Sequence, residues 1–255
     1  MLIKNNDIIE VKNLSKKYGD KLAVNNINFE VRQGEIFGIL GPNGAGKTSA
    51  LEMMETLRSI SSGTITIDGI NVTKQPNKIK QIIGVQLQSS NFYDKITLQE
   101  SLKLFASFYN RKIKPIDLLK KVDLESKAKA YPENLSGGQK QRFSIAVALV
   151  NQPKVLFLDE PSTGLDPQAR HNLWELINKI KDGGITIVLT SHYMEEAEKL
   201  CDRVAIMDEG QIISLDTPAN LISNLIKGGF RSKKTVEQAN LEDVYINLTG
   251  KELRE

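Results

Sequence analysis

A glycine-rich segment, GPNGAGKTS at residues 41–49, constrains this chain more than any other feature. It follows the apolar run EIFGIL and precedes a stretch that is compatible with a helix. In this setting backbone N–H groups and the helix N-terminus face a phosphate, the lysine adds a positive charge, and the threonine hydroxyl can bind Mg²⁺. The segment therefore predicts a phosphate-binding loop in which Lys47 contacts the phosphates and Thr48 the metal ion.

A second apolar run, VLFLDEP at residues 155–161, ends in two adjacent carboxylates. Nucleotide-binding sheets hold their ligands at the edge where the parallel strands end. Asp159 could support Mg²⁺ at such an edge, and Glu160 could polarise an attacking water molecule. An acidic turn after a strand is common by itself, so the catalytic interpretation depends on the glycine loop that accompanies it.

Three more side chains are candidates for contact with a nucleotide. His192 follows the apolar run ITIVLTS and could donate a hydrogen bond to a γ-phosphate, although a lone histidine is more often structural. Gln88 closes the run IIGVQLQ and could orient water or Mg²⁺, or could be a polar residue that merely ends a strand. Tyr18 could stack on a base or pack against the sheet.

Apolar periodicity divides the chain into three kinds of segment. Residues 7–38 hold three β-like runs that indicate antiparallel strands, and the third run is GEIFGIL. Residues 61–72 indicate a hairpin that joins the same sheet. From about residue 97 to 150 the pattern is helical, with Thr97 as a candidate cap, and PIDLLKKVDLESKAKAY continues it. The apolar positions of its first helix are Leu98, Leu102, Phe105 and Phe108. After Pro153, strands alternate with helices, which is typical of a parallel sheet with crossover helices.

Composition excludes several classes of partner. The chain has 34 basic and 31 acidic side chains and a net charge of +3, which is too balanced to predict binding to nucleic acid or polybasic attachment to a membrane. No apolar run reaches the roughly 18 residues needed to cross a bilayer, and the first residues lack the pattern of a secretory signal. The single cysteine, Cys201, excludes an internal disulfide and is interpreted as a packed structural thiol. We therefore expect a cytoplasmic protein.

The segment LSGGQKQR, which begins at residue 135, has two adjacent glycines suited to a phosphate, but no catalytic lysine follows them. Five features occur in one order: GPNGAGKT, Gln88, LSGGQKQR, LFLDEP with STGLD, and TSH. On these motifs, residues 7 to about 215 resemble the nucleotide-binding subunit of an ATP-binding cassette (ABC) transporter, whose signature is LSGGQ. Other phosphate-loop ATPases share only the first feature and a version of the fourth.

The resemblance implies an α/β fold, with a P-loop NTPase (RecA-like) core, an antiparallel β subdomain and an α-helical signature subdomain. The ABC ATPase domain would span residues 1–215, with the β subdomain at about 7–35 and 61–72 and the helical subdomain at about 89–151. Residues 216–255 would form a short C-terminal helical tail, which resembles that of multidrug and other ABC-2 type exporters. Within the tail, residues 227–234 indicate a mobile linker, and Leu241, Val244, Tyr245 and Leu248 follow helical spacing.

The resemblance also implies roles for individual residues. Catalysis would depend on Glu160 as the base, His192 as the γ-phosphate switch, Gln88 and Lys47. Mg²⁺ would be held by Thr48, Gln88 and Asp159. The nucleotide would contact Tyr18, Gly41, Pro42, Asn43, Gly44, Ala45, Gly46, Lys47, Thr48 and Ser49. The residues Leu135, Ser136, Gly137, Gly138, Gln139 and Asp166 would instead act at the ATP bound by a partner subunit.

One motif departs from the family pattern, because an aromatic residue and a proline commonly precede the glutamine where this chain has VQLQ. Gln86 is therefore a rival to Gln88. We favour Gln88 because it lies four residues after Gly84, which is the family's spacing. In an isolated subunit we expect Ser136 and Gly138 to be exposed and far from Lys47.

The function implied is ATP hydrolysis that closes and reopens a dimer of ABC subunits, identical or different, and so drives separate membrane permease subunits, with export favoured by the tail. The subunit would lie on the cytoplasmic face of the membrane through its permease partner. Two alternatives stay open at this stage. One is a soluble ABC ATPase of translation or DNA repair, and the other is a module that senses ATP without significant turnover. Nothing in the chain identifies a transported substrate.

Overall fold

The computed structural model describes residues 6–86, 92–230 and 241–249, and the side chains of 241–243 are outside this description. The strands are β1 (Asp7–Tyr18), β2 (Lys21–Arg32), β3 (Ile36–Leu40), β4 (Ser62–Ile67), β5 (Ile70–Asn71), β6 (Ile83–Gln86), β7 (Val155–Asp159), β8 (Thr186–Ser191), β9 (Arg203–Asp208) and β10 (Gln211–Asp216). The helices are α1 (Lys47–Met54), α2 (Pro76–Ile82), α3 (Leu98–Phe108), α4 (Pro115–Lys121), α5 (Gly137–Ala148), α6 (Pro167–Asp182), α7 (Met194–Leu200), α8 (Pro218–Lys227) and α9 (Leu241–Thr249).

The strands form two sheets. The first is antiparallel, with strand order β2-β1-β4-β5, and the second has the order β10-β9-β3-β8-β7-β6. Within the second sheet β9, β3, β8, β7 and β6 pair in parallel, and only β10 is antiparallel to its neighbour. Because parallel strands of one sheet end at the same edge, the residues that follow β3, β7 and β8 are brought together there.

The parallel sheet is buried on both faces, and its side chains alternate between two hydrophobic clusters. Leu156 and Leu158 of β7 point into the cluster formed with the large helices, whereas Val155 and Phe157 point into the cluster shared with the antiparallel sheet and α1. This follows from the two-residue side-chain period of a strand. A strand with two buried faces must be apolar throughout, which is why VLFL has no polar residue.

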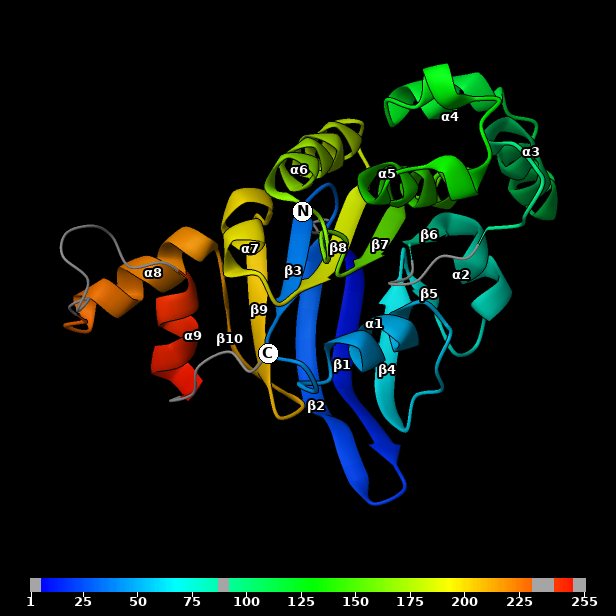
Figure 1. The fold of residues 1–255 in the computed structure, drawn as a ribbon. Coiled ribbons are helices and arrows are strands. Elements are labelled where there is room, and N and C mark those ends of the chain that lie inside the picture. The colour runs from blue at the N-terminus through cyan, green and yellow to red at the C-terminus, as the bar shows by residue number, and fades with distance from the viewer. Residues whose placement is uncertain (1–5, 87–91, 231–240, 250–255) are drawn as a thin grey trace.

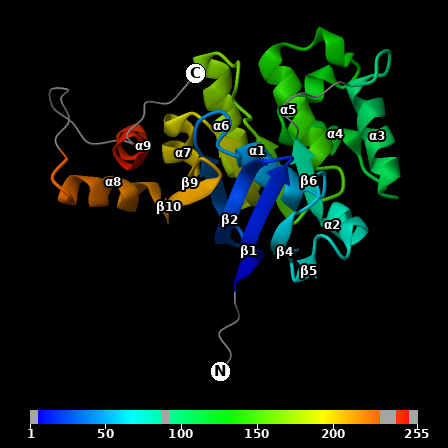
Figure 2. The same ribbon diagram turned by 90° about the horizontal axis from the view of Figure 1, so that it is seen from below.

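The helices occupy different sides of the two sheets (Figure 1). Helix α1 packs between β2 of one sheet and β7 and β8 of the other. Helices α6 and α7 cover the opposite face of the parallel sheet. In both views, α3 and α4 lie at one side of the molecule and α8 and α9 at the other (Figure 1, Figure 2).

Several predictions about elements are confirmed. Residues 62–71 form a β-hairpin that pairs with β1 through β4. The chain after Pro153 alternates β7, α6, β8, α7 and β9. Thr97 is the N-cap of α3. Cys201 is free and buried.

Two predictions about elements are wrong. The run GEIFGIL is not part of the antiparallel opening, because β3 pairs in parallel with β8 and β9 and all five of its residues are buried. The helical pattern from residue 115 to 131 does not form one helix. It ends after α4, where Asp123 adopts the left-handed conformation with φ 53°, and continues only as the short 3₁₀ turn Glu125–Lys127.

Two apolar positions are more exposed than their helical spacing indicates. Leu98 and Leu102 are buried, but Phe108 at the end of α3 is 61% exposed. In the tail, α9 forms as predicted; Val244 and Tyr245 are buried, whereas Leu248 is 39% exposed. Residues 231–234 of the predicted linker lie outside the described residues. In the part of the chain that the structure describes, no helix has both the length and the apolar character needed to span a bilayer.

Candidate nucleotide-binding site

The glycine loop joins β3 to α1, and close packing requires its glycines. A Cβ atom on Gly41 would lie 2.0 Å from the carbonyl oxygen of Met207, and one on Gly46 would lie 2.3 Å from that of Ala23. Gly46 also has φ 101° immediately before the first residue of α1. Since β-carbons do not approach backbone oxygens so closely, a side chain at either position would displace the loop from the strands behind it.

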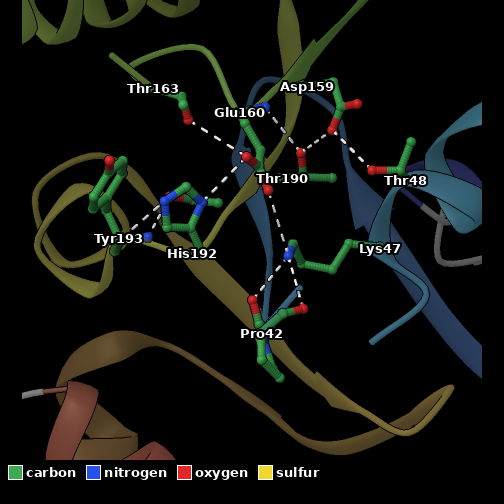
Figure 3. Close-up of polar contacts among 11 residues, drawn as sticks. Pro42, Lys47, Thr48, Asp159, Glu160, Thr163, Thr190, His192 and Tyr193 are labelled. Atoms are coloured by element: carbon green, nitrogen blue, oxygen red, sulfur yellow. Dashed lines mark hydrogen bonds and ion pairs between the residues drawn. The ribbon is translucent and has the colours of Figure 1, made fainter. Parts of the chain in front are cut away.

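Lys47, the first residue of α1, places its ammonium group inside the loop (Figure 3). Its Nζ donates to the carbonyl oxygens of Gly41 at 2.8 Å and Pro42 at 3.1 Å, and the side chain is 4% exposed. Nζ also lies 3.5 Å from Oε1 of Glu160. Burial lowers the pKa of Lys47, and the neighbouring Glu160 carboxylate opposes that shift. The side-chain nitrogen is therefore positioned where the loop can present it to phosphate.

Asp159 ends β7 beside Thr190 of β8, because the two residues are paired in the strand register. Thr190 Oγ1 donates a short hydrogen bond to Asp159 Oδ1, and Thr48 Oγ1 lies 3.4 Å from the same oxygen. Burial raises the pKa of Asp159, while the hydrogen bond from Thr190 opposes the shift. A hydroxyl and a carboxylate side by side are oxygen ligands of the kind that Mg²⁺ prefers, and that ion commonly uses only one or two protein groups beside phosphates. These residues therefore fit Mg²⁺.

The Glu160 side chain lies between Lys47 of the loop and His192, which follows β8. Its Oε1 faces Lys47, its Oε2 lies 3.2 Å from Nδ1 of His192, and Thr163 Oγ1 is 3.4 Å from Oε2 (Figure 3). The backbone of Glu160 is left-handed, with φ 47°. Its N–H donates to both the carbonyl and hydroxyl oxygens of Thr190, at 3.2 and 3.0 Å. Such strained conformations are kept only where surrounding contacts hold them, and they concentrate at functional sites.

A cleft of about 420 Å³ opens over these groups. It is lined by Tyr18, Lys21, Ala23, Asn43, Gly44, Gly46, Lys47, Thr48, Ser49 and Glu160. Tyr18 is 37% exposed and its hydroxyl lies 3.3 Å from Ser49 Oγ. Lys16 Nζ lies 5.0 Å from the centre of the Tyr18 ring, a cation–π distance that holds the ring in place. The cleft can thus accept a molecule with phosphates at one end and an aromatic base at the other.

Some predicted nucleotide contacts lie elsewhere in the loop. Pro42 and Ala45 line a separate cavity of about 80 Å³, together with Asp208, Glu209 and Tyr245. Sequence reasoning did not single out Lys21, Ala23 or Thr190. Thr190 carried a usable signal, because it is a polar residue near the end of the apolar run ITIVLTS and two residues before His192.

The LSGGQ segment is set apart from this cleft. Ser136 is the N-cap of α5 and forms a capping box with Gln139: the backbone N–H of Ser136 donates to Gln139 Oε1 at 3.0 Å. Ser136 and Gly137 are exposed, Gly138 is half-buried, and Leu135 is buried. The prediction of exposure is thus confirmed for Ser136 and is wrong for Gly138.

Gly138 is half-buried because α6 packs against it: a Cβ on Gly138 would lie 3.1 Å from the Cβ of Ala169. Asp166 is the N-cap of α6 and accepts from the N–H of Ala169 at 2.8 Å. The LSGGQ segment and Asp166 therefore lie at neighbouring helix N-termini, and none of them is among the described residues that line the cleft over Lys47.

The predicted glutamine lies outside the described residues, which stop at Gln86 and resume at Phe92. The rival residue Gln86 ends β6 beside Leu158 of β7 and is 1% exposed.

A glycine loop at a helix N-terminus, a buried lysine within it and paired carboxylates on the adjacent strand together define a phosphate-loop nucleotide-binding protein. The family model described as "ABC transporter" matches residues 24–163, which is more than half of the chain. The chain therefore belongs to the ABC transporter family, and it is an ATP-binding subunit and an ATPase of that family.

Two similar relatives are ATP-binding proteins of bacteria. The chain is 44% identical to the Nod factor export ATP-binding protein I of Burkholderia orbicola, over 86% of this chain and 73% of the relative. It is 39% identical to the linearmycin resistance ATP-binding protein LnrL of Bacillus subtilis, over 86% of this chain and 72% of the relative.

Solved structures show the same fold. One described as the ATP-binding subunit of an ABC transporter superposes with a TM-score of 0.81 at 30% identity, over 95% of this chain and 99% of the other. A dimeric ATP-binding cassette in a post-hydrolysis state, bound to ADP and Pi, superposes with a TM-score of 0.74 at 28% identity, over 82% of this chain and 98% of the other.

Proposed function

We propose that this chain powers an exporter: it pairs with a second ABC subunit around two ATP molecules, and closure and hydrolysis drive separate membrane permease subunits. Relatives named for Nod factor export and for linearmycin resistance support the direction of transport. A solved dimeric cassette at 28% identity supports the pairing.

The position of Ser136 carries this proposal. It lies exposed at the N-terminus of the twelve-residue helix α5, where the helix dipole favours an anion. It is not among the described residues that line the cleft over Lys47. This helix end is suited to phosphate but does not line the ATP site of its own chain. That placement is explained if it completes the ATP site of a partner subunit.

The contacts of Glu160 support its role as the base. Its carboxylate lies within 3.5 Å of Lys47 and 3.2 Å of His192, so ATP that enters the cleft brings its γ-phosphate close to all three groups. Lys47 would then donate to phosphate oxygens, His192 would donate to the γ-phosphate, and Glu160 would accept the proton of the attacking water. Mg²⁺, held by Thr48 and Asp159, would offset the negative charge that develops on the phosphates.

An aromatic surface supports docking to a permease. Tyr93, which is 58% exposed, and Phe108, which is 61% exposed, flank Phe105, with ring centroids 6.4 and 6.0 Å from it. Three neighbouring aromatic rings at a surface are typical of a protein contact, where large side chains are covered at little entropic cost. We assign them to a cytoplasmic segment of the permease, which would hold this subunit at the cytoplasmic face of the membrane.

The division into regions follows the same proposal. Residues 1–215 would form the ATPase domain, with residues 7–35 and 61–72 as the β subdomain and residues 89–151 as the helical subdomain. Residues 216–255 would form the tail.

The test is Glu160→Gln, which removes the base and keeps the side-chain volume. Phosphate release should fall by at least about a hundredfold, and ATP should produce dimers that persist on a sizing column. The control is Glu175→Gln, which changes an exposed carboxylate on α6 with 57% side-chain exposure and should leave phosphate release unchanged. Steady hydrolysis by Glu160→Gln would remove Glu160 as the base, and monomers at every ATP concentration would contradict the dimer.

A further inference from the structure

A second and larger cleft lies at the other end of the parallel sheet. It has a volume of about 730 Å³ and is lined by the segment before α4, α4 itself, the segment between α5 and β7, and the end of α6 with the turn before β8. Helices α4, α5 and α6 lie together at the top of Figure 1. The lining residues described for this cleft and those described for the ATP cleft have no member in common.

The floor of this cleft is apolar and buried. Leu118 of α4, Leu149 and Val150 after α5, and Ile180 of α6 line it and are each less than 10% exposed. Ile113 and Ile185, which are half-buried, extend the same surface toward the opening. A cavity of this volume with an apolar lining is in the size range of small-molecule sites, which is about 300 to 1,000 Å³.

The rim of the cleft is basic. Four exposed lysines line it, and a single carboxylate, Asp117, opposes them. The lysines are Lys112, Lys114, Lys121 and Lys179. The chain as a whole is nearly balanced, with 34 basic and 31 acidic side chains, so a surplus of three positive charges around one apolar cleft is a local feature. Ammonium groups above an apolar floor match a ligand that has one anionic end and an apolar body.

The lysines also come from two different parts of the chain. Lys112, Lys114 and Lys121 lie on or beside α4, whereas Lys179 lies in the last turn of α6. An anionic group between Lys114 and Lys179 would therefore contact lysines from two different helices. Lysines on the solvated face of one helix would contact it from one side only.

We propose that this cleft binds an anionic amphiphile, that is, a small molecule whose carboxylate, sulfate or phosphate group contacts the lysine rim while its alkyl or aryl body covers Leu118, Val150 and Ile180. The site is separate from the ATP cleft, and the proposal does not depend on export or on dimer closure. It predicts a ligand that binds this chain without competing for the residues that hold ATP.

The experiment is calorimetric titration of the full chain with decanoate, kept below the concentration at which it forms micelles. Decanoate should bind saturably with one molecule per chain, and decyltrimethylammonium, which has the same tail with the opposite charge, should not. The variant Lys114→Ala/Lys179→Ala removes one lysine from each wall and should weaken decanoate binding about tenfold, which corresponds to about 1.4 kcal/mol. The control Lys103→Ala/Lys127→Ala removes the same charge from exposed positions that do not line the cleft and should bind decanoate like the unmodified chain.

A second variant, Ile185→Trp, fills the opening without changing charge and should also abolish saturable binding. Retained phosphate release by each variant verifies that it is folded. The proposal is overturned if decanoate shows no saturation, if both double variants bind equally, or if the cationic amphiphile binds as well as decanoate. It is also overturned if the chain binds anionic phosphatidylglycerol vesicles through Lys114 and Lys179 but does not bind monomeric decanoate, because the rim would then recognise a membrane surface.

Discussion

Glu55 carries a buried carboxyl group directly after α1, close to the nucleotide site. It is 3% exposed, and among the described residues Oε1 has no hydrogen-bond partner. Burial, reinforced by the nearby charges of Asp159 and Glu52, raises the pKa of Glu55 from 4.5 to about 8. The folded state therefore holds this proton more tightly than the unfolded state, and the associated stability is fully present below about pH 4.5 and is lost as the pH rises toward 8.

Glu55→Gln should remove that pH dependence, because a neutral amide replaces the protonated acid. Relative to the unmodified chain, the variant should gain stability on going from pH 5 to pH 8, by an amount on the order of 2 to 4 kcal/mol. Urea unfolding of both proteins at the two pH values measures this difference. Glu175→Gln, which alters an exposed carboxylate on α6 that does not act on Glu55, is the control. If the free energies of unfolding of Glu55→Gln and the unmodified chain differ by the same amount at both pH values, Glu55 does not have a raised pKa in the folded chain.

At the scale of the element, α3 and α5 begin with the same kind of cap, but we propose a role at the partner's ATP for α5 alone. Each has a capping box, formed by Thr97 with Glu100 in α3 and by Ser136 with Gln139 in α5. A side chain that caps a helix typically contributes about 1 kcal/mol. Ser136 therefore has a structural role that is independent of any role at an interface, and a loss of activity on its removal is ambiguous unless it is compared with the loss of another cap.

Thr97→Ala supplies that comparison. We expect Thr97→Ala and Ser136→Ala to lower the free energy of unfolding by similar amounts, about 1 kcal/mol each. Only Ser136→Ala should also lower phosphate release, because in our proposal α5, and not α3, presents its N-terminus to the partner's ATP. Chemical denaturation and steady-state phosphate release, measured on both variants, separate the two effects. Equal losses of activity would assign the effect of Ser136→Ala to helix stability alone.

Helix α9 faces the phosphate loop across a small cavity. Tyr245 is 1% exposed and lines the small cavity that it shares with Pro42, Ala45 and the turn at Asp208 and Glu209. In the same region the N–H of Gly210 donates to the carbonyl oxygen of Ala45 at 3.0 Å. The tail and the nucleotide loop thus line one cavity although more than 190 residues of the chain separate them.

Tyr245→Ala should leave a cavity beside the loop, with a loss of about 3 kcal/mol of stability. Because the enlarged cavity adjoins the loop, the KM for ATP should rise several-fold, by more than kcat falls. Val244→Ala is the control, since Val244 is 3% exposed on the same helix and is not among the described residues that line this cavity. If both variants change the KM equally, the effect is a general loosening of the tail.

At the scale of the whole molecule, our proposal gives one chain two half-sites. The loop with Lys47 would bind ATP from one side, and the helix end with Ser136 would cover an ATP bound by a partner subunit. In the closed dimer that we propose, Ser136 completes the ATP site of the partner and not the ATP site of its own chain.

Mixing two inactive variants tests this division of the site. Lys47→Ala should weaken ATP binding and Ser136→Ala should impair hydrolysis, so each alone should show little phosphate release. Heterodimers of the two contain one intact site, formed by Lys47 of one subunit and Ser136 of the other, and the mixture should recover measurable phosphate release. A mixture of Lys47→Ala with Glu160→Gln should not recover it, because both defects lie in the same half-site. The absence of recovery in the first mixture would contradict sharing of the site.

Local pattern predicted many elements because the physical cause was itself local. The alternating run at residues 62–71 formed a hairpin, and the threonine before an apolar helical repeat became the cap of α3. The prediction failed where partners distant in sequence decide the outcome. The pairing of β3 with β8 and β9 depends on segments about 150 residues away, and the exposure of Phe108 depends on what packs beside α3.

By itself, the sequence determined the phosphate loop, the two carboxylates at the end of β7 and the order of the ABC motifs. These features depend on glycine, lysine and acidic residues that are close together in the sequence, so their backbone geometry and charge are set locally. Only the tertiary structure decided that Thr190 bonds the Asp159 carboxylate and the Glu160 backbone, that Gly138 is covered by α6, that Tyr245 shares a cavity with the loop and that four lysines surround an apolar cleft. Each of these depends on side chains that are far apart along the chain and adjacent in space, and the packing of the two sheets and their helices brings them together.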